Sequence, residues 1–393
     1  MSIRSIHPLS KQHAFVPTAP AASGYEQAIR TLLGSAGVQV GGQQPYDLRV
    51  HDARFYRRVL RQGSLGFGES YMQGWWDCPS IDSLISRLLQ ANVDEAVKDN
   101  PHVWWQVLRA RLFNLQSFRR AYQVADAHYN LGNDLFVAML DRNLCYSCAY
   151  WKGAEDLDQA QANKLDLLCR KLDLQPGEHV LDIGCGWGSF AHYAATHYGV
   201  RVTGVTVSSE QQKLAQERCR GLPVDIQLLD YRKLDGRYDK LVSIGMFEHV
   251  GRKNYPAYFD VAQRVLKDGG LFALHTIGND RVTPVTDPWI ERYIFPNGSI
   301  PALGQIASAC EAYFLIDDVQ NFGPDYDTTL MAWKRRFDAA WSGLSQRYDE
   351  RFRRMWVYYL SACAGGFRSG QMQLYQVVMR HRNRQRARYD APR

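Results

Sequence analysis

The chain has 393 residues, of which 46% are hydrophobic and 22% charged, a composition typical of globular proteins that excludes a disordered chain. Its length accommodates one large or two ordinary domains. The formal net charge of +7 is unevenly placed, because residues 1–125 and 380–393 are basic and the part between them is mildly acidic. Basic ends indicate an anionic partner, either a membrane surface or nucleic acid, although an uneven but solvated surface has the same pattern.

Apolar segments and cysteines restrict the compartment. No apolar run approaches the ~20 residues that span a bilayer, and residues 1–23 lack the apolar core of a signal peptide. We therefore expect a cytoplasmic protein. The eight cysteines show no paired framework, which predicts reduced thiols. No metal is expected, because Cys145-x-x-Cys148 has neither a second CxxC nor a suitably spaced His pair.

Residues 1–125 are predicted to form a mainly helical N-terminal domain. Helices are expected from Tyr25 to the glycines at 34–42, at 55–60 and at 81–89, with a short strand at 46–50. The glycine- and aromatic-rich segment 63–76 predicts either a compact turn that exposes its aromatic rings or a glycine-bent packing corner. Residues 101–123 combine a Trp, Phe and Leu face with arginines and no acidic residue. This composition predicts a helix on a membrane surface, although the same face could pack against the rest of the protein.

The stretch 178–189, E-H-V-L-D-I-G-C-G-W-G-S, organises the rest of the chain. A short apolar run bounded by glycines predicts a buried parallel strand, and helical spacing resumes at Phe190. A dinucleotide fingerprint needs its third glycine one residue later, where Ser189 stands. The pattern D-x-G-x-G-x-G is instead the form of class I methyltransferases and predicts S-adenosyl-L-methionine as cofactor, a dinucleotide or a purely structural turn being the alternatives. The predicted cofactor residues here are Asp182, Gly184, Cys185, Gly186 and Gly188.

Regular alternation follows the glycine turn. Strands are expected at 200–205, 224–228, 240–244 and 271–275, and helices at 157–172, 210–219 and near 258–266. This order predicts an α/β class I methyltransferase fold: a doubly wound, mostly parallel sheet with its ligand at the carboxyl ends of the strands. Residues 279–301 form an insertion expected to act as a lid. Helices at 331–344 and 352–363 precede a last strand at 374–379, predicted to be an antiparallel edge strand. The catalytic domain is expected to span 126–393.

Further cofactor contacts are predicted at later strand ends. Thr206 and Gln211 stand where most class I methyltransferases place an acidic residue for the ribose, so neutral side chains are expected to serve. Asp230 can accept from the adenine amino group and Tyr231 can stack on the ring, loop capping being the alternative. Two neighbouring strand ends carry Glu248 and His275, which points to a catalytic site beside the cofactor.

Long stretches of the chain resemble the bacterial cyclopropane-fatty-acyl-phospholipid synthases, which are related to the mycolic acid cyclopropane synthases. They include G-S-L-G-F-G-E-S-Y-M-Q-G-W-W, Y-S-C-A-Y-W, G-M-F-E-H-V-G, L-H-T-I-G and D-Y-D-T-T-L. The resemblance implies methylene transfer from S-adenosyl-L-methionine to a cis double bond of an acyl chain in a membrane phospholipid, through a carbocation that a bound bicarbonate ion deprotonates. It adds Tyr146 and Ser147 to the cofactor residues. It assigns bicarbonate to Cys148, Glu248, His275, Ile277 and Tyr326, and catalysis to Cys148, Glu248, His275, Tyr326 and a reactive Cys363.

The resemblance also implies partners and a place in the cell. It suggests a homodimer, peripheral on the inner face of the cytoplasmic membrane, whose lipid partner is the unsaturated phospholipid and which binds no nucleic acid. Three readings compete with it: a methyltransferase that stops at methylation of a lipid alkene or a small amine, a lipid-surface binding protein with a relic cofactor fold, and a nucleic-acid-modifying enzyme. No base-flipping signature supports the last.

Overall fold

The computed structural model describes residues 24–93, 132–283, 286–382 and 388–393. Within these residues no helix is both long and apolar enough to cross a membrane. The helix predicted at 101–123 and the domain boundary at residue 125 lie outside the described residues, so both stay predictions.

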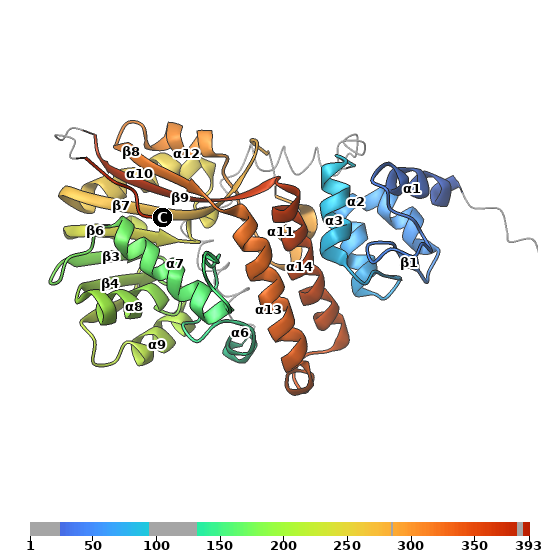
Figure 1. Ribbon diagram of the computed structural model, residues 1–393, viewed down its shortest axis with the longest axis horizontal. Coiled ribbons are helices and arrows are strands. Elements are labelled where there is room, and N and C mark those ends of the chain that lie inside the picture. Colours follow the sequence, from blue (N-terminus) through green and yellow to red (C-terminus); the bar gives the residue numbers. More distant parts are fainter. Residues whose placement is uncertain (1–23, 94–131, 284–285, 383–387) are drawn as a thin grey trace, which may run out of the picture.

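A seven-stranded sheet in the order β5-β4-β3-β6-β7-β9-β8 forms one end of the molecule (Figure 1). Its strands are β3 (His179–Ile183), β4 (Arg201–Thr206), β5 (Val224–Leu228), β6 (Tyr238–Ile244), β7 (Leu266–Asn279), β8 (Phe314–Asn321) and β9 (Met372–His381). The five strands from β5 to β7 are mutually parallel, and β9 runs antiparallel to both of its neighbours. The predicted doubly wound α/β sheet is confirmed.

The predicted edge position of the last strand is wrong. β8 pairs with β9 along its outer side and is itself the edge. The sequence analysis missed β8 because Asp317 and Asp318 interrupt its apolar pattern. The structure pairs both carboxylates, Asp317 with Arg380 and Asp318 with Lys171 and Arg393, so tertiary ion pairs permit charges that periodicity alone argues against.

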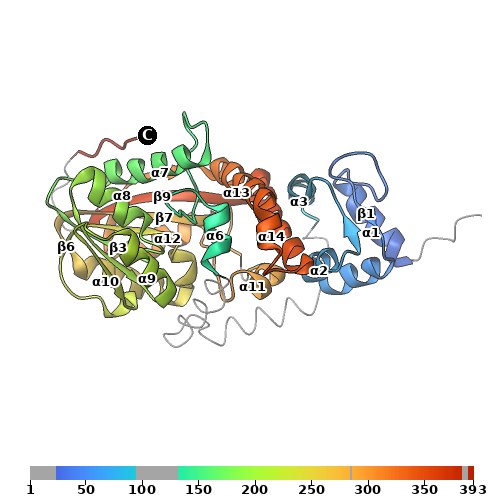
Figure 2. The same cartoon turned by 90° about the horizontal axis from the view of Figure 1, so that it is seen from below.

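Helices cover both faces of the sheet. One face packs against α7 (Leu157–Lys171), α8 (Ser189–Tyr198) and α9 (Ser209–Arg218), and the other against α10 (Tyr255–Val265) and α12 (Leu303–Cys310). Figure 2 shows α7 and α10 on opposite sides of the strands. Within β3, Val180 faces the first set and Leu181 the second. Alternating side chains of a central parallel strand are thus buried on both faces, as its continuous apolar run predicted.

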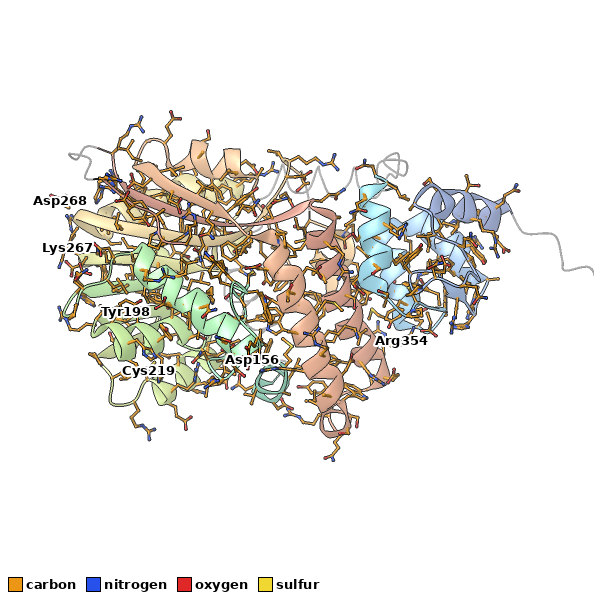
Figure 3. The ribbon with its side chains drawn as sticks, viewed as in Figure 1. Asp156, Tyr198, Cys219, Lys267, Asp268 and Arg354 are labelled. Atoms are coloured by element: carbon orange, nitrogen blue, oxygen red, sulfur yellow. The ribbon has the colours of Figure 1, made fainter. Side chains whose placement is uncertain are left out.

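Two long helices, α13 (Gly323–Leu344) and α14 (Glu350–Ser369), stand between the sheet and the N-terminal elements (Figure 1). The N-terminal elements are α1 (Gly24–Ser35), β1 (Arg49–Val50), α2 (Arg54–Met72), β2 (Trp76–Asp77) and α3 (Ile81–Gln90). α14 packs closely on α3, because Gly365 lies where a Cβ would meet the backbone oxygen of Asp82 at 2.6 Å. Arg354 of α14, labelled in Figure 3, donates to Asp77 of β2 at 2.7 Å.

The prediction of an aromatic-exposing turn at 63–76 is wrong, and so is the expected end of the preceding helix at residue 60. α2 continues to Met72 across a kink at Gly63, whose φ is +55°. Phe67 and Trp76 are buried, which realises the alternative of a glycine-bent packing corner. The glycines serve close approach: a Cβ on Gly68 would lie 2.5 Å from Trp289 Cδ1 on α11 (Pro288–Tyr293).

We expect Gly68→Ala to lower the melting temperature, because the added methyl must displace the buried Trp289 ring and overpacking costs about 1–3 kcal/mol. Gly343→Ala is the matched control. Gly343 is also helical, but a Cβ there meets nothing within 4 Å, so this change should leave the melting temperature unchanged or raise it. Equal melting temperatures for Gly68→Ala and the parent protein would contradict the close contact.

Candidate active site

A cavity lies at the carboxyl ends of β3, β4 and β6, the edge at which the fold class places a ligand. Most of the predicted cofactor residues line it: Tyr146, Ser147, Asp182, Gly184, Cys185, Gly186, Thr206, Gln211, Asp230 and Tyr231. Gly188 is not part of the lining. It is the residue before α8, with φ at +77°, and a Cβ there would approach Ala215 of α9 at 3.2 Å.

In the glycine turn, the close approach that the missing side chains allow matters more than free backbone N–H donors. The N–H groups of Gly184 and Cys185 both donate to the carbonyl of Val205 at 3.0 Å, which joins the ends of β3 and β4. Gly184 has φ at +82°, and a Cβ on it would lie 2.6 Å from Met246 Cγ, which also lines the cavity. A side chain at this position would therefore push Met246 into the space left for a ligand.

The far end of the cavity carries the residues predicted for ribose and adenine. The Thr206 hydroxyl donates to Gln211 Oε1 at 2.8 Å, which leaves the amide nitrogen as the donor side of Gln211. Asp230 accepts from the backbone N–H of Arg232 at 3.0 Å and from its Nε at 2.8 Å, which caps the short helix η2 (Tyr231–Lys233). The capping alternative is thus realised while Asp230 still lines the cavity.

Asp182, at the end of β3, carries a buried carboxyl group in the cavity wall. Among the described residues its Oδ1 has no hydrogen-bond partner. Burial raises the pKa of Asp182 to about 7, opposed by the positive charge of Lys164. Buried polar atoms are normally satisfied, so an orphaned oxygen in a cavity wall indicates a ligand that donates to it. The ammonium group of an amino-acid moiety has the required chemistry.

A second group of polar atoms lies next to the cavity. Glu248, in the short helix η3 (Phe247–His249) after β6, accepts from the Ile277 N–H at 2.7 Å through Oε1. Its Oε2 has no hydrogen-bond partner in the part of the chain that the structure describes. Burial raises the pKa of Glu248 to about 7. His275, on β7, has an unpartnered Nε2, and burial lowers the pKa of its ring well below the usual value. A ring nitrogen of a neutral imidazole and a carboxyl oxygen are thus both without a hydrogen-bond partner among the described residues.

Tyr326 of α13 completes this group. Its phenol is buried, which raises its pKa, and the charges that Cys148, Tyr146 and Glu248 would carry raise it further. The Cys148 thiol donates to the carbonyl of Ala149 at 3.1 Å, and burial raises its pKa, so it stays protonated.

Ile277 and Cys363 differ from the other predicted site residues. Ile277 uses its N–H to hold Glu248, so in this structure that donor is already engaged. Cys363 lies on α14, away from the cavity lining and next to Tyr326, Tyr358 and Tyr359. Burial raises the pKa of the Cys363 thiol to about 12, which favours packing over nucleophilic chemistry. The bicarbonate-binding role of Ile277 and the catalytic role of Cys363 stay predictions, as do the roles of the other site residues.

The chain matches a family of known proteins over most of its length. The family model for mycolic acid cyclopropane synthetase matches residues 116–377. The chain is 55% identical over 350 residues to the cyclopropane-fatty-acyl-phospholipid synthase of Escherichia coli K12, covering 88% of this chain and 91% of that protein.

The chain belongs to the mycolic acid cyclopropane synthetase family.

Two further relatives of the family bear on the cofactor and the product. Tuberculostearic acid methyltransferase UfaA1 of Mycobacterium tuberculosis is 36% identical over 374 residues, covering 88% of this chain and 87% of that protein. The mycolic acid cyclopropane synthase CmaA1, solved in complex with SAH and CTAB, aligns with a TM-score of 0.62 at 32% identity over 66% of this chain and 97% of that one. The predicted family and fold class are confirmed, and the protein is an S-adenosylmethionine-dependent enzyme.

Two polar residues at the site, Lys164 and Gln376, were not predicted from the sequence. Lys164 of α7 lines the cavity and donates to Ser147 Oγ at 2.9 Å. Gln376 of β9 lies directly opposite His275, with its Nε2 at 3.2 Å from His275 Nδ1. Gln376 carried a signal, because it is a lone polar residue within the apolar run of β9, whereas Lys164 lies among other polar residues of α7 and carried none. With the amide oriented in this way, Nδ1 accepts and Nε2 of His275 carries the proton.

Proposed function

We propose that this enzyme transfers a methylene group from S-adenosyl-L-methionine to the cis double bond of unsaturated acyl chains in membrane phospholipids and forms cyclopropane fatty acids. A bound bicarbonate ion is proposed as the base. The relatives' names support the reaction class. The observation that carries the proposal is the pair of orphaned buried atoms, Glu248 Oε2 and His275 Nε2, beside the cofactor cavity.

These two atoms have complementary chemistry for bicarbonate, which carries one hydroxyl donor and negatively charged acceptor oxygens. The Glu248 carboxylate accepts from the hydroxyl, and the Nε2–H of neutral His275 donates to an oxygen. Tyr326, next to Glu248, offers a further donor, and Cys148 lies beside it. The anion therefore needs no cationic partner, and its hydroxyl relieves the repulsion that the carboxylate of Glu248 would otherwise cause.

S-adenosylmethionine supplies an electrophilic methyl group on a sulfonium centre. Because an alkene is a weak nucleophile, the protein must hold the two in line at near-attack distance. Positive charge then develops on the acyl chain, where water would quench it. Tyr146 is well suited to exclude water there: it lines the cavity, bonds to the Tyr359 hydroxyl at 2.8 Å, and packs its ring 5.2 Å from those of Phe136 and Trp333. Aromatic ring faces also stabilise positive charge.

The proposal includes a location and an assembly. We propose that the protein is cytoplasmic, binds peripherally to the inner face of the cytoplasmic membrane, and acts as a homodimer. The basic residues of 101–123 and the basic carboxyl-terminal segment support the membrane contact.

Binding to vesicles of anionic phospholipid is expected to weaken as salt rises and when Arg109, Arg111, Arg119 and Arg120 are replaced by Ala, because each basic residue near an anionic leaflet adds about 1 kcal/mol. Sedimentation with vesicles measures this. Replacing Arg142, which is exposed and outside that segment, is the control. Unchanged binding of the fourfold variant would exclude this segment as the contact.

The reaction is tested with methyl-labelled S-adenosylmethionine and vesicles of an unsaturated phospholipid, followed by lipid mass spectrometry. We expect label in the acyl chain and a mass gain of one CH2 that resists hydrogenation, and no label with fully saturated vesicles. Removing bicarbonate by degassing should slow the reaction, and adding it back should restore the rate. Label on a headgroup amine, or a product that hydrogenation still reduces, would contradict ring formation.

A further inference from the structure

We propose that Lys164 binds the carboxylate of the cofactor's amino-acid end, a contact that rests on the proposed function and defines how this family member recognises its cofactor. Lys164 lies on α7, is 1% exposed and lines the cavity. Its ammonium group donates to Ser147 Oγ at 2.9 Å. Among the described residues no carboxylate lies within the 4.0 Å of an ion pair with it.

A buried ammonium group with one neutral partner is costly. It has three N–H donors, and a charge taken out of water needs a partner of opposite charge to offset several kcal/mol of lost hydration. The acidic groups that its charge reaches, Asp141 and Asp182, stand beyond ion-pair distance. The anion that completes this site is therefore a ligand group in the cavity.

The same helix contains a second buried lysine, Lys171, which has a charged partner. Lys171, two turns after Lys164, is 0% exposed and does not line the cavity. Its ammonium lies 3.2 Å from Asp318, which Arg393 also contacts. α7 thus pairs its buried lysine where no ligand is expected and leaves the lysine unpaired where the cavity begins.

The position of Lys164 indicates which group of the cofactor it binds. Thr206 and Gln211, predicted for the adenosyl part, lie at and after the end of β4, whereas Asp182 lies in β3, directly before the glycine turn. Lys164 lines the same cavity and bonds to Ser147. The methionine moiety of the cofactor is zwitterionic, because it carries an ammonium group and a carboxylate group. The orphaned Oδ1 of Asp182 suits its ammonium and Lys164 its carboxylate. Since no ion pair joins Asp182 to Lys164, the orphaned oxygen of Asp182 and the ammonium of Lys164 both stay available to the ligand.

Lys164 also affects the titration of the second polar group. The positive charge of Lys164 lowers the pKa of His275, although burial has the larger effect, and it opposes the rise in the pKa of Cys148. The charge of Lys164 therefore acts on the residues of the proposed bicarbonate site as well as on those of the cofactor cavity. The cofactor carboxylate is favoured over bicarbonate as the partner of Lys164, because Lys164 and Ser147 both line the cavity, whereas Glu248 and His275 do not.

The test is calorimetric binding to the full chain of two probes, S-adenosylhomocysteine and methylthioadenosine, the second of which lacks the amino-acid end. We expect Lys164→Met to weaken S-adenosylhomocysteine about 10–100-fold, as losing charge-assisted hydrogen bonds does, and to leave methylthioadenosine within about twofold. Lys171→Met is the control and should change neither, because Arg393 still pairs Asp318. Binding needs no lipid, so this outcome is independent of whether the product is a cyclopropane.

Three results would overturn the proposal. Equal weakening of both probes would assign Lys164 a structural role only. Unchanged binding together with an altered bicarbonate dependence of the rate would assign it to the bicarbonate site. If Lys164→Met does not fold, the parent protein decides: it should bind S-adenosylhomocysteine at least about tenfold more tightly than the decarboxylated analogue, and equal affinities would refute the contact.

Discussion

Glu248→Gln is expected to lower kcat by about 10²–10⁴-fold, the range found for positioned acid–base groups, while the affinity for S-adenosylhomocysteine changes less than about twofold. The amide keeps the shape of the carboxylate and can still accept from the Ile277 N–H. It replaces the unpartnered acceptor Oε2 by either a neutral oxygen or a donor, which no longer holds the bicarbonate hydroxyl. Glu248 does not line the cofactor cavity, so cofactor binding should be spared.

The same substitution should stabilise the protein at high pH. Burial holds the pKa of Glu248 at about 7, above its ordinary value of 4.5, so the folded protein keeps a proton that the unfolded chain loses between these values. The Glu248 carboxyl group therefore lowers the free energy of unfolding as pH rises from 4.5 to about 7. Above pH 7 the loss is on the order of 3 kcal/mol. Glutamine has no such dependence.

Melting temperatures at pH 4 and pH 8 check the stability effect, and turnover with calorimetric binding checks the catalytic one. The variant should melt higher than the parent at pH 8 and close to it at pH 4. Glu311→Gln, at an exposed position after α12, should alter neither property. Equal losses of turnover and cofactor affinity in Glu248→Gln would contradict the role assigned to Glu248.

The second large effect is expected at the glycine turn. Gly184→Ala should weaken S-adenosylhomocysteine binding by about 10–100-fold. The alanine must adopt a left-handed conformation, which costs roughly 1–2 kcal/mol, and its Cβ would lie 2.6 Å from Met246 Cγ and 2.7 Å from Met246 Cβ. Because both atoms are near the Met246 backbone, the loop after β6 must move, and this loop forms part of the cavity wall.

Gly177→Ala separates the two contributions. Gly177 precedes the same strand with φ at +84°, but a Cβ there meets nothing within 4 Å. This variant carries the same backbone strain, so both variants should lose stability, and only Gly184→Ala should lose cofactor affinity. Calorimetry and thermal melting distinguish them. Similar affinities for the two variants would show that close approach at Gly184 plays no part in binding.

Local patterns predicted the fold of the catalytic part except for its edge strand. The strand and glycine turn around Asp182 have a short-range signature, and the carboxyl ends of parallel strands meet at one edge of the sheet. Side chains such as Thr206 and Asp230 could therefore be placed together from their strand ends, and the structure puts both on the cavity wall. The edge strand β8 was missed, since its aspartates are compensated only by residues distant in the sequence.

The sequence by itself determined the alternation of strands and helices and the residues that follow each parallel strand, because both depend on neighbours in the chain. Only the tertiary structure decided which polar groups remain without a partner. Whether Lys164, Glu248 or His275 is satisfied depends on side chains brought in by other strands and helices, such as Gln376 on β9. Burying a polar group is costly only when that environment fails to pair it, and a linear pattern carries no record of such pairing.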